Sequence, residues 1–167
     1  VFGEVDDPIS ENVAIAFKYG FKKQFEKQVM DEVASTPQTV LPQDYAGRTD
    51  MTDVFFMTWD PAGCKDKDDA IYAEQTDFGY KVYVAIADVA HYVKRGTELD
   101  KEATRRGNSC YLGNGVYPML PPELSNGICS LNPNVPRLAL VCQIDIDKKG
   151  KILNYNFEKA VINVKQS

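Results

Sequence analysis

The sequence predicts an α+β fold in which helices flank a mostly antiparallel β-sheet. Helical periodicity with capping signals fills the first 35 residues and returns over residues 97–106. Elsewhere, short β-favouring apolar runs are separated by tight-turn sequences, which is typical of antiparallel hairpins. With 167 residues, of which 44% are hydrophobic, the chain is long enough to bury a core.

Three helices are predicted from their ends. Asp7 is a suitable N-cap before Pro8 at the first helical position, and Gly20 is a suitable stop. A second helix is expected over residues 23–35, with one apolar face, and Thr36-Pro37 ends it. Residues 36–50 are weakly patterned and are expected to form a connector. A third helix is expected from Thr97, as N-cap, to Arg106, before Gly107.

The β-structure is predicted from apolar runs and turn signals. Its expected parts are a β-favouring run at 54–59, a hairpin of 70–73 and 80–87 around Asp77-Phe78-Gly79, a tight turn at Asn114-Gly115, and a hairpin of 138–146 and 152–157 around residues 147–150. Residues 118–136 carry five prolines, so we expect a long shaped loop there, with at most a short helix near Pro122.

Composition excludes several classes of protein. No apolar run approaches the length of a membrane span, and no secretory signal is visible. There is no Cys-x-x-Cys and only one histidine, His91, so a zinc site is poorly supported and free thiols in the cytoplasm are expected. The net charge of −5 argues mildly against nucleic acid as a partner, although a local basic groove remains compatible with it.

Four aspartates occur within ten positions, between two β-favouring runs: Asp60, Asp66, Asp68 and Asp69. Pro61 and Gly63 can turn the chain so that the first approaches the others. Two carboxylates about 4 Å apart repel by roughly 4 kcal/mol at an effective dielectric near 20. Convergence would therefore raise pKa values or recruit a cation, and oxygen ligands select the hard ions Mg²⁺ or Mn²⁺.

An exposed acidic turn is the main alternative for this segment, because charge runs are usually solvated. A calcium EF-hand fits poorly, since Ala70 and Ile71 stand where an oxygen ligand and a glycine are required. The spacing indicates a hard-metal site and leaves the substrate open.

Four blocks in order resemble the ribonuclease II / ribonuclease R family, whose catalytic unit is the RNB domain. They are Asp-x₅-Asp-x-Asp-Asp at 60–69 followed by Ala70-Ile71, IADVAHYV at 86–93, RGNSCYL at 106–112, and PMLPPELSNGICSLNP at 118–133. The resemblance covers about residues 44–162. It implies a helical linker over residues 1–43 and the N-terminal portion of an RNB-type catalytic domain over residues 44–167, as part of a longer protein.

The resemblance implies a 3′-to-5′ hydrolytic exoribonuclease that releases nucleoside 5′-monophosphates from single-stranded RNA, with Mg²⁺ or Mn²⁺ as cofactor and RNA-decay machinery as a possible partner. Asp60 and Asp69 match direct metal ligands. Asp66 completes the metal cluster and is also expected, like Asp68, to be catalytic. Asp68 matches the aspartate most critical for catalysis. Tyr111 matches a tyrosine that packs against the 3′-terminal base, and such stacking tolerates every base.

Departures from the family pattern are Trp59, Cys64 and Lys67, which replace the usual Ile, Ala and an apolar residue; none removes a carboxylate. The family's later catalytic arginine and its cold-shock and S1 domains have no counterpart in this sequence, so the isolated chain is expected to be inactive. Two rival functions stay open: a catalytically inactive relative that binds RNA or docks a partner, and an unrelated calcium-binding module.

Overall fold

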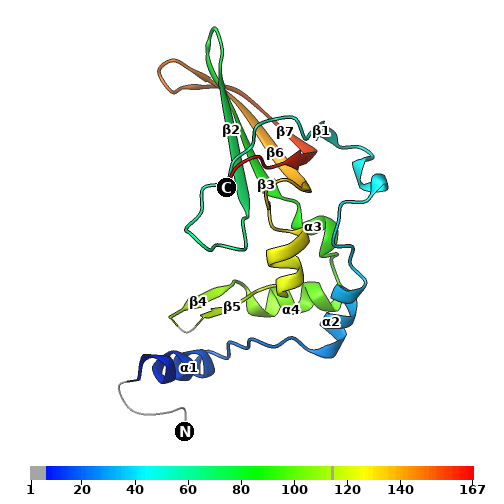
Figure 1. Ribbon diagram of the computed structural model, residues 1–167, viewed down its shortest axis with the longest axis vertical. Coiled ribbons are helices and arrows are strands. Elements are labelled where there is room, and N and C mark those ends of the chain that lie inside the picture. The colour runs from blue at the N-terminus through cyan, green and yellow to red at the C-terminus, as the bar shows by residue number, and fades with distance from the viewer. Residues whose placement is uncertain (1–6, 114) are drawn as a thin grey trace. The chain divides into compact units, whose positions relative to one another are not determined.

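The computed structural model describes residues 7–113 and 115–167 (Figure 1). The chain forms two compact units, Val1–Thr36 with Val93–Pro122 and Pro37–Tyr92 with Glu123–Ser167. The predicted boundary after residue 43 stays a prediction. No helix in the described part of the chain is long and apolar enough to cross a membrane.

The first unit contains three helices and a two-stranded ribbon: α1 (Pro8–Lys18), α2 (Lys27–Ala34), α4 (Glu98–Arg106), β4 (Cys110–Leu112) and β5 (Gly115–Tyr117). The predicted caps of two helices are confirmed. Asp7 accepts from the backbone N–H groups of Ile9 and Ser10, and Thr97 accepts from that of Asp100. Strands β4 and β5 pair antiparallel around the predicted turn, of which Asn114 lies outside the described residues.

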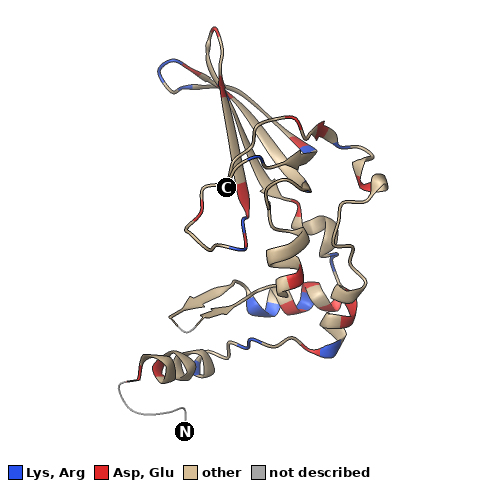
Figure 2. Cartoon of the chain, in the orientation of Figure 1, with Lys and Arg blue, Asp and Glu red and all other residues tan. Residues whose placement is uncertain are grey.

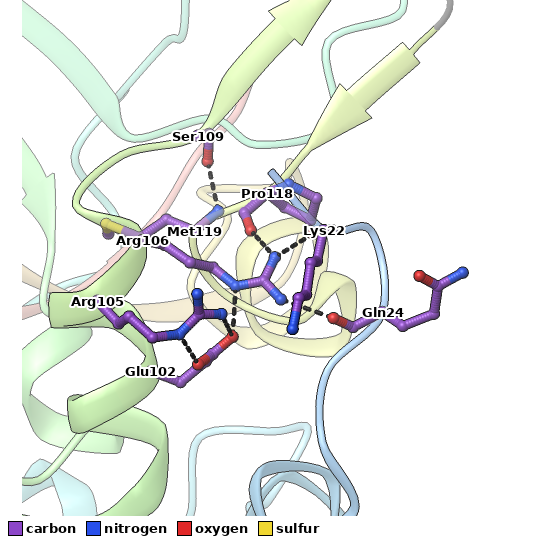
Figure 3. A network of polar contacts seen from close by, with 8 residues as sticks. All are labelled: Lys22, Gln24, Glu102, Arg105, Arg106, Ser109, Pro118 and Met119. Carbon is purple, nitrogen blue, oxygen red and sulfur yellow. Dashed lines mark hydrogen bonds and ion pairs between the residues drawn. The ribbon is translucent and has the colours of Figure 1, made fainter. Parts of the chain in front are cut away.

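The second helix starts at Lys27, four residues later than predicted, and Arg106 explains the difference. Its guanidinium donates to the carbonyls of Lys22 (2.6 Å) and Gln24 (2.7 Å), as Figure 3 shows. It also lies 3.7 Å from the centre of the Phe25 ring. These contacts hold residues 22–25 in a non-helical path, so a tertiary contact overrides the local helical preference.

Glu102 holds the two arginines at the end of α4 (Figure 3). Arg105 donates to both of its carboxylate oxygens, at 2.8 and 2.6 Å, and Arg106 to one at 2.8 Å. Arg106 is nearly buried, with 8% of its side chain exposed, and also donates to the Pro118 carbonyl. The Arg106 side chain therefore joins α4 to residues 22–24 and to Pro118 within the first unit.

Helices α2 and α4 are joined by a capping interaction between them. The carboxylate of Glu32 in α2 accepts from the N–H groups of Glu98 and Leu99, at 3.0 and 2.8 Å. These are first-turn donors of α4 that have no partner within their own helix. A carboxylate at a helix N-terminus also interacts favourably with the helix dipole.

The second unit is built on a five-stranded sheet with the order β1-β7-β6-β3-β2 (Figure 1). The strands are β1 (Thr49–Met51), β2 (Asp69–Gln75), β3 (Gly79–Ala87), β6 (Pro136–Asp147) and β7 (Ile152–Asn163), accompanied by the 3₁₀-helix η1 (Pro42–Tyr45), α3 (Val89–Tyr92) and the π-type helical segment η2 (Glu123–Ile128). All pairs are antiparallel except β1 with β7. The predicted fold class and both predicted hairpins are confirmed.

One face of this sheet carries the core. Small residues lie across its centre, so bulky side chains from outside the sheet can pack closely on it; the alanines, all fully buried, are Ala70, Ala85, Ala139 and Ala160. Phe56 is completely buried in this cluster and meets the rings of Tyr72 and Tyr83 edge-on. The opposite face leaves apolar side chains partly exposed, namely Ile71, Ile86, Leu140 and Phe157.

The β-favouring run at residues 54–59 does not form a strand. Only Met57 forms bridges, antiparallel to Ile71 and parallel to Gln166. The apolar character of this run comes from Phe56, which the core requires, and the remaining residues do not continue a ladder.

Glycine is required where β3 begins. Gly79 has a φ of 155°, and a Cβ at this position would lie 2.2 Å from the carbonyl oxygen of Ile146. The turn signal Asp77-Phe78-Gly79 therefore reflects close approach of β6 as well as chain reversal.

The Glu102 ion pairs generate a prediction about acid stability. Hydrogen bonds from Arg105, then Arg106, lower the pKa of Glu102 from 4.5 to about 2. A depressed pKa stabilises the fold above pH 4.5, and the stabilisation is lost as pH falls towards 2. Glu102→Gln should cost about 2 kcal/mol at pH 7 and remove this part of the acid sensitivity.

Hydrogen exchange of the α4 amides at pH 7 and pH 4, corrected for the intrinsic rates, measures the effect. Glu98→Gln is the matched control, because it breaks an exposed i,i+3 pair with Lys101 and should cost well under ~1 kcal/mol. Equal losses in the two variants would contradict the role given to Glu102.

Candidate functional site

The four aspartates lie on a loop that the sheet closes at its base. Met57 and Ile71 exchange backbone hydrogen bonds of 2.9 and 2.8 Å, so the residues between them form an excursion from the edge of β2. Thr58 N–H also donates to the carbonyl of Gln166 at 3.0 Å. Residues 58–70 are called the acidic loop below; Figure 2 colours its acidic residues red and its lysines blue.

A turn brings the first aspartate back towards the second. Cys64 N–H donates to the Pro61 carbonyl at 3.0 Å, and Gly63 has a φ of 85°. The Cys64 thiol then lies 3.7 Å from Oδ1 of Asp60 and 3.5 Å from Oδ1 of Asp66. Burial, the largest cause, raises the pKa of this thiol, so it meets both carboxylates as a neutral group. The predicted approach of Asp60 to Asp66 is therefore present.

The last two aspartates are fixed by the sheet. Asp69 is the first residue of β2 and pairs with Ile86 of β3, while the carbonyl of Asp68 accepts from Ala87 N–H at 2.9 Å. Burial, then the charges of Asp66, Asp69 and Asp60 in that order, raises the pKa of Asp68. The charges of the other three aspartates thus all act on Asp68, and no lysine or arginine is among the causes that act on it.

The acidic loop carries carboxylate oxygens of the kind that bind hard metal ions, but these oxygens do not converge on one point. Within residues 7–113 and 115–167, no three or more His, Cys, Asp or Glu side chains are arranged so that they could hold a metal ion. Mutual repulsion of carboxylates opposes such convergence. Oδ2 of Asp60 is nevertheless buried without a hydrogen-bond partner, a costly state for a carboxylate oxygen. The oxygen-rich donor set and this orphaned atom fit a divalent cation.

The exposed position of Trp59 beside the acidic residues was not predicted from the sequence. Trp59 is 91% exposed and, together with Asp60, lines a shallow cavity of about 250 Å³. In sequence it stood out only as a departure from the family pattern. An exposed aromatic ring beside a carboxylate site is suited to stacking on a base.

A second polar group in this unit is structural. Asp88 is 6% exposed and accepts from Arg48 at 2.6 Å, and Arg48 also approaches Nδ1 of His91 at 3.4 Å. Since a guanidinium only donates, Nδ1 accepts, and Nε2–H of His91 donates to Asp44 at 3.2 Å. These contacts give His91 and Asp88 structural roles in the second unit.

Tyr111 belongs to the first unit. It lies on β4 opposite Val116 and is 62% exposed. Its predicted contact with the 3′-terminal base, like the predicted ligand roles of Asp60, Asp66 and Asp69 and the catalytic role of Asp68, stays a prediction.

Fold and acidic loop together define the family. The model of the RNB domain matches residues 48–167, so the chain belongs to the RNB domain family. The chain is similar to Ribonuclease R of Acidithiobacillus ferrooxidans, with 42% identity over 162 residues that make up 97% of this chain and 37% of that protein. The resemblance inferred from the four sequence blocks is confirmed.

Solved structures agree with this assignment. RNase R of Mycoplasma genitalium, in complex with ribose methylated single-stranded RNA, superposes with a TM-score of 0.90 at 41% identity and covers 99% of this chain and 26% of its own. Yeast Ssd1, a pseudonuclease, has a TM-score of 0.79 at 16% identity and covers 99% of this chain and 22% of its own, so that likeness concerns the fold alone. The chain spans well under half the length of these relatives.

The buried Arg48–Asp88 pair generates a prediction. Arg48→Met removes the partner of a buried carboxylate and should destabilise the second unit by about 3 kcal/mol, because breaking a buried pair leaves one charge uncompensated. Hydrogen exchange of α3 and β3 measures the loss.

Lys81→Met provides the control, since Lys81 lies 3.9 Å from Asp145 and both side chains are partly exposed. It should cost less than about 1 kcal/mol. A loss for Arg48→Met no larger than for Lys81→Met would show that the buried pair is not a structural anchor.

Proposed function

We propose that this chain forms part of a 3′-to-5′ hydrolytic exoribonuclease that releases nucleoside 5′-monophosphates from single-stranded RNA with the help of Mg²⁺ or Mn²⁺. The observation that carries the proposal is the complete set of four aspartates on one loop of an RNB-family fold, where the charges of the other three act on Asp68. A relative with this fold is known in complex with single-stranded RNA, which supports RNA as the substrate.

The proposed roles follow from the position of each carboxylate. Asp60, Asp66 and Asp69 would hold the metal, and the buried Oδ2 atom of Asp60 is an oxygen for which the fold offers no other partner. A bound divalent cation supplies Lewis acidity at the phosphodiester and lowers the pKa of a coordinated water. Asp68, fixed by the backbone of Ala87, would accept a hydrogen bond from the attacking water and orient it.

Strand recognition is proposed for exposed aromatic residues. The Tyr111 ring would stack on the 3′-terminal base, and stacking accepts all four bases because every base has a π-face. The net charge of −5 does not oppose this, because the acidic loop concentrates negative charge where the metal would neutralise it. Action in the cytoplasm and association with RNA-decay machinery stay predictions.

A catalytically inactive relative is the main rival function. The pseudonuclease Ssd1 has this fold at 16% identity, so the fold alone does not decide the chemistry. All four aspartates are present here, which favours an active enzyme. The match to the RNB domain family removes the unrelated calcium-binding module as a rival.

Substitution of Asp68 tests the proposal in the full-length protein. Asp68→Asn should abolish release of 5′-mononucleotides, with at least a 100-fold loss of rate, and leave RNA affinity within about threefold, because it removes a catalytic group and keeps the strand contacts. Single-turnover cleavage and equilibrium binding of a labelled RNA measure the two quantities.

Asp53→Asn, an exposed aspartate that precedes the acidic loop, is the matched control and should leave the rate unchanged. Equal losses of rate and affinity in Asp68→Asn would count against a chemical role. A wild-type protein without divalent-dependent cleavage would contradict the proposed function itself.

A further inference from the structure

One buried hydroxyl holds the acidic loop on both sides of Asp66. Ser130 is fully buried, and its Oγ accepts from Lys67 N–H at 3.1 Å and donates to the Lys65 carbonyl at 2.8 Å. A second acceptor, Oδ1 of Asn132, is farther away at 3.4 Å, so the single hydroxyl proton is better placed for Lys65. Ser130 therefore fixes both peptide neighbours of Asp66.

Two further backbone contacts extend this anchor to Asp68. Leu131 N–H donates to the Lys67 carbonyl at 2.9 Å, and Ala87 N–H donates to the Asp68 carbonyl at 2.9 Å. All these contacts engage the backbone of the loop. They therefore fix the main chain from which the carboxylates of Asp66 and Asp68 project.

Arg137 supports Ser130 from the sheet. Its side chain is buried and donates to the Ser130 carbonyl at 2.8 Å, the Pro136 carbonyl at 2.9 Å and the Gly127 carbonyl at 3.2 Å. The residue belongs to β6, in the centre of the sheet. A continuous chain of hydrogen bonds thus leads from β6 through Ser130 to the peptides that flank Asp66.

We propose that Ser130 and Arg137 are positioning residues that hold the backbone of the acidic loop in a path from which its carboxylates can converge on a divalent cation. The inference rests on the proposed function, since it assigns these residues a role towards the same metal. Groups that orient metal ligands without touching the metal typically change affinity or activity by about 10–100-fold when they are removed.

The test measures Mn²⁺ affinity of the full-length protein by the EPR signal of free Mn²⁺, with no RNA present. Ser130→Ala should weaken Mn²⁺ binding by at least about tenfold. In cleavage assays the Mg²⁺ concentration for half-maximal rate should rise similarly, while kcat at saturating Mg²⁺ and KM for RNA change less than about threefold. A merely structural role would not produce this separation.

Two controls separate positioning from general damage. Val161→Ala removes volume at a fully buried position of β7 in the same unit, and it should lower thermal stability while leaving Mn²⁺ affinity unchanged. Ser125→Ala removes a hydroxyl from η2 and should also leave Mn²⁺ affinity unchanged.

Arg137→Lys is the second variant and keeps the test decisive if Ser130→Ala does not fold. A lysine keeps the charge and cannot donate to three separate carbonyls from a planar fork, so at least a fivefold loss of Mn²⁺ affinity is expected. Wild-type affinity in folded Ser130→Ala or Arg137→Lys protein, or an equal loss in Val161→Ala, would overturn the inference alone. No saturable Mn²⁺ binding by the wild type would overturn the proposed function and the inference together.

Discussion

Repulsion among four carboxylates is the constraint on which the arrangement of the second unit depends. The acidic loop places Asp60, Asp66 and Asp69 near enough to Asp68 to raise its pKa. Such a loop would open if only its own sequence held it, because each pair of like charges favours separation. The fold opposes this with contacts to the backbone of the loop, which restrain its path and leave the carboxylates outside the anchoring hydrogen bonds.

These contacts come from parts of the chain that are rigid for separate reasons. Phe56 enters a core built on alanines and holds the segment before the loop against the sheet. Strand β2 begins at the last aspartate and is paired along its length with β3. Ser130, supported by Arg137, completes the attachment from the Pro-rich segment. The buried arginines and the Ser130 hydroxyl therefore stabilise the structure of this unit, and the proposed chemistry is assigned to the carboxylates of the acidic loop.

Sequence patterns were sufficient wherever local chemistry decides the structure. Asp7-Pro8, Thr97 and Gly107 define helix ends through capping, and Asp77-Phe78-Gly79 defines a hairpin through its turn; all four appear as predicted. The late start of α2 could not be predicted, because its cause is Arg106, more than 80 residues away in the chain. The β-favouring run at residues 54–59 does not form a strand, because Phe56 packs into the core and only Met57 forms β-bridges.

The candidate site divides in the same way. The four aspartates are evident from the sequence because they lie within one short segment. The turn residues Pro61 and Gly63 also predict that Asp60 approaches Asp66. Ser130 could not be found, since it acts across 63 and 65 residues and is one serine in a loop rich in turn residues. Arg137 carries no sequence signal either, because a buried arginine that binds carbonyls looks like any surface cation at the start of a strand.

Anomalous diffraction from Mn²⁺ in crystals of the full-length protein tests the central claim most directly. The account predicts a manganese peak at the acidic loop, contacted by carboxylate oxygens of Asp60 and Asp69 with Asp66 beside them. A peak bound elsewhere, or a loop that stays without manganese at concentrations that support RNA cleavage, would contradict it.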